Sequence, residues 1–192
     1  MASTKLVKVW DLPVRVFHWL LVVSFFVAYF TEDELLTIHV WAGYLVLGLL
    51  IFRLVWGFVG NDYARFSSFL CSPAKSYAYV KDAIALKSKR YLGHNPAGAA
   101  MIVLLISSLF MTVISGLVVY AADQNLGPLA GMVGASNEKL WEEVHEITAN
   151  FTLLLVIVHV VGVAFESVIH GENLVKAMWN GYKKSNNVDV DN

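Results

Sequence analysis

The chain is poor in charge and in cysteine. Only 15% of its 192 residues are Asp, Glu, Lys or Arg, well below the share of about a quarter that is usual in soluble domains. Cys71 is the only cysteine, which excludes an intramolecular disulfide, an iron–sulfur cluster and a cysteine-rich zinc site. No Cys-x-x-Cys-His motif for covalent haem attachment occurs, and no phosphate-binding glycine loop or hydrolase-type nucleophile motif. We expect no nucleic-acid partner.

Long apolar segments dominate the sequence, and 57% of its residues are hydrophobic. We predict membrane spans at 13–31, 37–59, 98–121 and 142–167, because about 20 apolar residues cross a bilayer as a helix. A soluble bundle would not explain the stretch 99–122, which has no charged residue. The expected fold is therefore an all-α integral membrane four-helix bundle, a single domain over 1–184. The polar tail 185–192 is expected to be disordered, and the first apolar run to be an uncleaved anchor.

The distribution of basic residues predicts the orientation. With the N-terminus inside, all of the 14 Lys and Arg residues except Lys139 fall on one side of the membrane or at its edge. Both termini and the 60–97 connection are thus expected in the cytoplasm, in a multi-pass protein of the bacterial inner membrane. Within that connection, an amphipathic helix from Pro73 to about Lys87 is expected to lie on the lipid headgroups.

Four histidines lie inside the predicted spans. His145 and His159 are fourteen residues apart, nearly four helical turns, so they share a face about 21 Å apart along the axis. His18 lies near the cytoplasmic end of its span and His39 near the outer end of the next. Depth therefore pairs His18 with His159, and His39 with His145.

These pairs predict a cofactor. Ionisable residues inside membrane spans are costly and usually functional. Singly, each histidine could be an interfacial or hydrogen-bonded imidazole, but two pairs matched in depth predict the axial ligands of two non-covalent haem b groups. Gly43 follows His39 by one turn and Gly162 follows His159 by three residues, so a flat macrocycle would have room at both helices.

Other polar residues near the cytoplasmic edge have less specific interpretations. His94 and His170 lie in the flanks and are expected to be solvated at the surface. For His94 and the adjacent Asn95, contact with a quinone or a haem propionate is the functional alternative. Arg15 and Arg53 are candidates for pairing with propionates, although anchoring of the spans explains them equally well.

Short motifs accompany these positions: RVFHW at 15–19, HVWAGY at 39–44, FRLVWGF at 52–58 and GHNP at 93–96. Over roughly residues 5–184 the sequence resembles the bacterial cytochrome b561 and nickel–iron hydrogenase b-type cytochrome family, which is related to the formate dehydrogenase b subunit. The resemblance implies a four-helix membrane cytochrome with two b haems that exchanges electrons between a periplasmic partner and the quinone pool. Its ligand positions fall on the same four histidines.

The predicted function is transmembrane electron transfer between quinone and a periplasmic redox protein, such as a c-type cytochrome or a dehydrogenase or hydrogenase subunit. Acidic outer residues would attract a basic partner; they are Glu32, Asp33, Glu34, Asp123, Glu138, Glu142 and Glu143. One alternative is a stand-alone superoxide:quinone oxidoreductase, which a basic outer patch would favour. Another is a haem-free scaffold or transporter, which predicts mid-span carboxylates. Whether the chain is itself an enzyme stays open.

Overall fold

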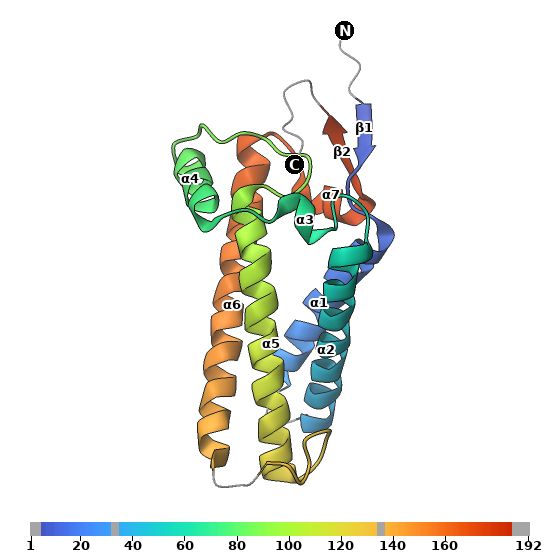
Figure 1. Cartoon of the computed structure of the whole chain (residues 1–192), viewed down its shortest axis with the longest axis vertical. Helices are drawn as coiled ribbons and strands as arrows, with labels where there is room; N and C mark the ends of the chain where they lie inside the picture. Colours follow the sequence, from blue (N-terminus) through green and yellow to red (C-terminus); the bar gives the residue numbers. More distant parts are fainter. Residues whose placement is uncertain (1–4, 32–34, 134–136, 186–192) are drawn as a thin grey trace. The chain divides into compact units, whose positions relative to one another are not determined.

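The computed structural model describes residues 5–31, 35–133 and 137–185, and within them the chain is mainly helical (Figure 1). The elements in order are β1 (Lys5–Lys8), α1 (Leu12–Phe30), α2 (Leu36–Val59), α3 (Phe66–Phe69), α4 (Pro73–Ile84), α5 (Pro96–Gln124), α6 (Glu138–Ile169), α7 (Leu174–Asn180) and β2 (Tyr182–Ser185). The predicted all-α class is confirmed. Part of the predicted acidic outer surface, residues 32–34, lies outside the described residues. So does most of the predicted tail, residues 186–192.

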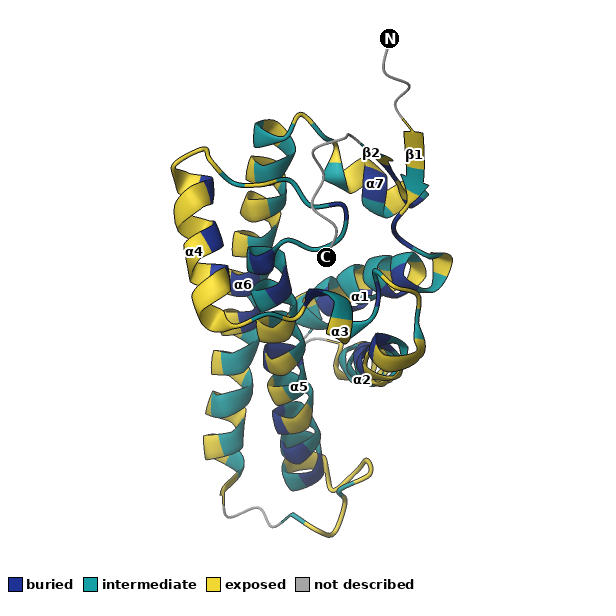
Figure 2. Ribbon diagram, turned by 45° about the horizontal axis from the view of Figure 1, so that its top comes forward, coloured by how far each residue is buried: buried dark blue, intermediate teal, exposed yellow. Residues whose placement is uncertain are grey.

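Four of these helices, α1, α2, α5 and α6, are long and apolar enough to cross a membrane, as predicted. Their most apolar windows are only between 11% and 28% buried, and exposed positions recur along the ribbon of α5 and α6 (Figure 2). Large apolar side chains such as Phe30, Phe58 and Val168 are exposed. Outward-facing apolar surface of this extent is costly in water and favourable in lipid. The helices therefore have the surface of a multi-pass membrane protein.

Polar caps explain where several helices begin. Asp11 Oδ1 accepts a hydrogen bond from Val14 N at 2.9 Å just before α1. Ser72 Oγ accepts one from Lys75 N at 3.3 Å, and Asn95 Oδ1 accepts one from Gly98 N at 2.7 Å. The last two caps are each followed by a proline, which suits the first helical position because its missing N–H would have no partner there.

The chain divides into two compact units, and each is described by itself. Unit 1 contains the described parts of Met1–Trp19, Phe52–Val103 and Val158–Asn192, and unit 2 contains Leu20–Ile51 and Leu104–Ile157. The core of unit 2 is formed by Phe25, Val46, Leu50 and Leu109, with Leu153 and Val156 among the residues packed against it. Segments of all four long helices thus meet in unit 2.

Unit 1 contains the short sheet, which the sequence did not predict. Strands β1 and β2 pair antiparallel, with Lys5 opposite Ser185 and Lys8 opposite Tyr182. Ser185, the first residue of the predicted tail, is therefore part of β2. Next to the sheet, Val9, Trp10 and Ala177 form a small buried cluster.

The surface helix predicted from Pro73 to about Lys87 is present as α4 but ends at Ile84. Leu86 adopts a positive φ of 57°, which a helix cannot continue through. On α4, the apolar residues Tyr77 and Ile84 are exposed, whereas Ser76, Tyr79 and Ala83 are buried. The helix itself is confirmed, and its position on the lipid headgroups stays a prediction.

Candidate functional site

The first histidine pair lies in unit 2. The ring centroids of His39 on α2 and His145 on α6 are 5.9 Å apart, with an angle of 81° between the ring planes. His39 Nδ1 lies 2.9 Å from the carbonyl oxygen of Ala28, and His145 Nδ1 lies 2.8 Å from that of Thr112. Since a carbonyl only accepts, each Nδ1 carries the proton and donates it. The Nε2 atom of each ring is then left as the metal-binding nitrogen.

Helix α5 provides a close-fitting seat for His145. A Cβ atom at Gly116 would lie 2.7 Å from His145 Cε1, so this position admits no side chain without movement. Ser115 Oγ donates to the Thr112 carbonyl at 2.9 Å and lies 3.2 Å from His145 Nδ1. About two turns after His145 on α6, the side chain of Thr152 is fully buried, and its Oγ1 lies 2.6 Å from Ser108 Oγ of α5. The seat therefore fixes both the position and the tautomer of the ring.

The second pair lies in unit 1. The ring centroids of His18 on α1 and His159 on α6 are 6.4 Å apart, with an interplanar angle of 55°. The ring of Trp19 meets His18 edge-on at 5.1 Å. His18 Nδ1 is buried and has no hydrogen-bond partner in the protein. A buried polar atom of this kind usually indicates a bound group or water that satisfies it.

The separation of the rings fits a metal between them. A metal-bound imidazole nitrogen lies about 2 Å from the metal, and the ring centre about 1 Å further. Two imidazoles on opposite sides of one metal therefore place their centroids roughly 6 Å apart. The observed 6.4 Å and 5.9 Å are close to this value.

The donor set also indicates which kind of metal group fits. Within the described residues, no cluster of three or more His, Cys, Asp or Glu side chains could hold a bare metal ion. Each pair offers only two imidazoles, so the remaining ligands must come with the metal. A haem meets this requirement because its porphyrin leaves two axial positions for the protein. A Cβ added at Gly43, one turn after His39, would meet nothing within 4 Å, which leaves the room a macrocycle needs.

Arg53 and Arg15, the predicted propionate partners, lie in unit 1. Arg53 is only 4% exposed, stacks on the Phe66 ring at 4.7 Å, and its Nη1 is buried without a partner. Arg15 donates through Nη2 to the Trp179 carbonyl, while its Nε is buried without a partner. A buried guanidinium with unused donors suits an anionic ligand such as a propionate.

His94 and His170 do not lie where the sequence predicted, because neither is a solvated surface residue. The His94 ring lies between Trp10 at 4.6 Å and Phe69 at 4.5 Å, and its Nδ1 is buried without a hydrogen-bond partner. The side chain of His170 is 14% exposed and reaches Glu166. The neighbour Asn95 caps α5 through its side-chain oxygen.

The buried position of His94 predicts an acid sensitivity. Burial, together with the positive charges of Arg53 and Lys183, lowers the pKa of His94 from 6.5 to about 3. Between these two values the unfolded chain binds a proton at this residue and the folded chain does not. Stability should therefore fall as the pH decreases from 6.5 towards 3, by at most about 1.4 kcal/mol per pH unit.

We expect His94→Phe, which keeps the aromatic packing, to reduce the decrease in melting temperature between pH 7 and pH 4.5. Thermal unfolding of both proteins in detergent measures this difference. Identical decreases in the two proteins would contradict the assignment.

The apolar spans and the paired imidazoles within them define a class: multi-pass helical membrane proteins of the b-type cytochrome kind. Residues 9–181 match the family model described as prokaryotic cytochrome b561, and the chain belongs to this family. It is accordingly a membrane b-type cytochrome that functions in electron transport.

Relatives match along nearly the whole chain. The probable Ni/Fe-hydrogenase B-type cytochrome subunit of Azotobacter chroococcum is 26% identical over 92% of this chain and 88% of its own length. The proteins of the same description from Cupriavidus necator and Rhodobacter capsulatus are 25% and 24% identical, covering 94% and 92% of this chain and 88% and 81% of the relatives.

Proposed function

We propose that the chain is a dihaem cytochrome b that passes electrons between a periplasmic redox protein and the membrane quinone pool. The observation that carries the proposal is the presence of two separate imidazole pairs, each with the ring separation of a bis-imidazole metal site. One haem b would bind at His18 and His159, and the other at His39 and His145. Both would be held without covalent attachment, by these ligands and by packing.

The residues of the chain then have distinct tasks. A bound haem supplies an iron that gains and loses one electron. The two imidazoles of each pair would hold this iron from the protein, which would favour electron transfer over binding of substrate to the metal. The Nδ1 bonds of His39 and His145 to backbone carbonyls fix ring orientation and increase ligand basicity. Arg53, and secondarily Arg15, would pair with propionates in unit 1.

The partners follow from chemistry and from the relatives. The relatives are described as hydrogenase cytochrome subunits, so we propose a periplasmic hydrogenase as the electron partner, with a small basic c-type cytochrome as the runner-up. Asp123, Glu142 and Glu143 are exposed and would attract basic side chains at the outer face. Quinone would exchange electrons at the inner haem, near His94 and Asn95.

We further propose that residues 1–184 form one domain in the bacterial inner membrane, with both termini in the cytoplasm. The positive-inside rule supports this orientation, because Lys139 is the one basic residue assigned to the outer side. The pairing of β1 with β2 supports it as well, since it joins the two ends of the chain in unit 1.

The haem content of the purified chain tests the proposal. A dithionite-reduced minus oxidised spectrum, combined with a pyridine haemochrome assay, should give two b haems per polypeptide. A quinol analogue should reduce them in proteoliposomes. One haem per chain, or none when haem is supplied during expression, would contradict the dihaem assignment, and haems that no quinol reduces would contradict the quinone assignment.

A further inference from the structure

Helix α6 carries a carboxylate on the same side as its haem ligand in unit 1. Glu166 follows His159 by seven residues and His170 follows it by eleven, both close to whole numbers of 3.6-residue turns. Glu166 therefore lies about 10 Å further along the axis on the same face. Its side chain is 15% exposed and that of His170 is 14% exposed, so both groups are largely removed from water.

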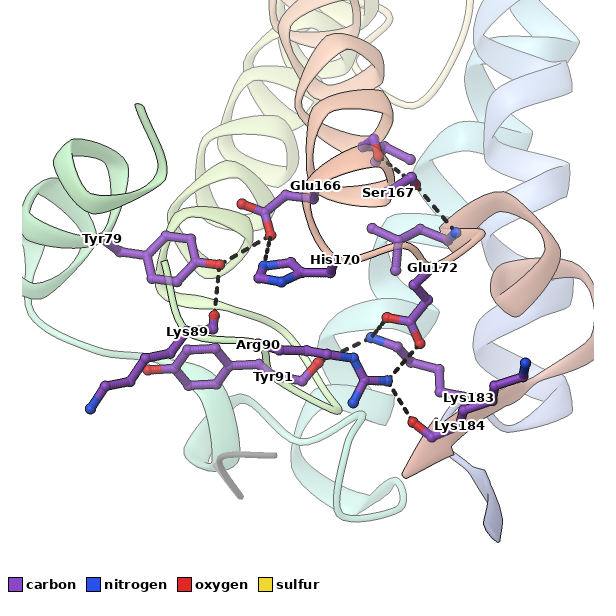
Figure 3. A network of polar contacts seen from close by, with 12 residues as sticks. Tyr79, Lys89, Arg90, Tyr91, Glu166, Ser167, His170, Glu172, Lys183 and Lys184 are labelled. Carbon is purple, nitrogen blue, oxygen red and sulfur yellow. Dashed lines mark hydrogen bonds and ion pairs between the residues drawn. The ribbon is translucent and has the colours of Figure 1, made fainter. Parts of the chain in front are cut away.

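These two groups are in contact with each other and with a tyrosine from α4 (Figure 3). His170 Nε2 lies 3.3 Å from Glu166 Oε2, and the Tyr79 hydroxyl donates to the same oxygen at 3.0 Å. The Tyr79 oxygen also lies 3.2 Å from the Lys89 carbonyl. Burial, and then the charge and hydrogen bond of Glu166, raise the pKa of Tyr79. The tyrosine thus stays protonated.

A second carboxylate nearby has a different environment. Glu172 forms ion pairs with Arg90 at 2.9 Å and with Lys183 at 3.1 Å. Glu166 meets a hydroxyl and an imidazole instead. Its own partners are Tyr79 of α4 and His170, and the Lys89 backbone carbonyl contacts the Tyr79 hydroxyl. The other charged groups drawn in this network are Arg90, Glu172 and Lys183 (Figure 3).

We propose that the Glu166–His170 pair takes up one proton when the haem at His18 and His159 is reduced, and releases it on oxidation. The inference rests on the proposed function, since it requires a haem at that pair. One electron from the redox partner enters the iron, and one proton from the aqueous phase forms an O–H bond on Glu166 or an N–H bond on His170. Reduction removes one positive charge from the site, so protonation nearby becomes more favourable. By the same linkage, protonation raises the affinity of the site for the electron.

The midpoint potential of this haem as a function of pH tests the proposal. In membranes containing the full chain, mediated redox titrations should show a potential that falls as the pH rises, because the proton becomes harder to acquire. In Glu166→Gln, which keeps a hydrogen-bond acceptor for Tyr79 but cannot titrate, most of this slope should be lost. Glu172→Gln removes the same charge in the same unit and should keep the slope.

Tyr79→Phe separates a structural role from proton exchange. It removes the hydroxyl contact and leaves the carboxylate, so the slope should persist. A slope in Glu166→Gln equal to that of the wild type, or no slope in the wild type, would overturn the inference while leaving the dihaem assignment intact. If His159→Ala retained both haems, the proposed function itself would fail. If Glu166→Gln does not accumulate, His170→Gln, which should also flatten the slope, replaces it.

Discussion

His18→Ala and His159→Ala should each remove the same haem and leave the other. Each substitution deletes one of the two proposed axial ligands, and a haem held by a single imidazole and packing would bind far more weakly. Haem content should fall from two to one per chain in both variants. The residual spectrum and midpoint potential should be identical in the two, because the surviving haem is the one at His39 and His145.

The complementary variants complete this experiment. His39→Ala and His145→Ala should lose the other haem, so that the four variants give two classes of residual spectrum. His170→Ala is the matched control, because it removes an imidazole directly after α6 that reaches Glu166 rather than another histidine. It should keep both haems. If His18→Ala and His159→Ala lost spectroscopically different haems, the pairing would be wrong.

The spans could be predicted because the physical cause is local. A run of about 20 apolar residues pairs all its backbone hydrogen-bonding groups when it forms a helix, and its side chains are stable in lipid. Neither property depends on contacts with other helices. The predicted span 37–59 therefore differs from α2 by one residue at its start. The proximity of His18 to His159, and of His39 to His145, also followed from a local quantity, the rise of 1.5 Å per residue.

The surroundings of the histidines depend on contacts between distant segments and were not predictable in this way. Thr112, Ser115 and Gly116 are on α5, and nothing in their own sequence says that His145 of α6 will lie against them. Their spacing of three and four residues indicates only that they share a helical face. His94 likewise appeared solvated because the two rings that cover it, Trp10 and Phe69, come from other parts of the chain.

The terminal sheet was missed for a different reason. Strands β1 and β2 have four residues each, and four of the paired residues are lysines: Lys5, Lys8, Lys183 and Lys184. Segments so short and so basic show no alternation of apolar and polar residues long enough to predict a strand. Each strand is stabilised by hydrogen bonds to the other, and the two strands lie at opposite ends of the sequence.

The second large effect is expected at Gly116, where a valine should displace His145 and remove the haem of that pair. Even a Cβ atom would lie 2.7 Å from His145 Cε1 and 3.1 Å from Nδ1. The ring cannot turn away without losing its bond to the Thr112 carbonyl, which lies 2.8 Å from Nδ1. Whether the ring is pushed aside or turned, its Nε2 no longer points at the proposed metal position. Loss of this supporting contact alone typically costs about 10–100-fold in metal affinity, and the branched side chain adds a direct clash.

A graded series distinguishes this mechanism from general damage to the helix. Gly116→Ala should weaken the haem at His39 and His145, and Gly116→Val should abolish it, whereas the haem at His18 and His159 should remain in both. Gly48→Ala provides the matched control, because a Cβ there meets nothing within 4 Å and nine residues place it on the opposite side of α2 from His39. Ser115→Ala leaves space for the ring and removes only a hydroxyl near Nδ1, so it should retain the haem with a shifted midpoint potential. Full haem occupancy in Gly116→Val would show that His145 is not held against α5 when the haem is bound.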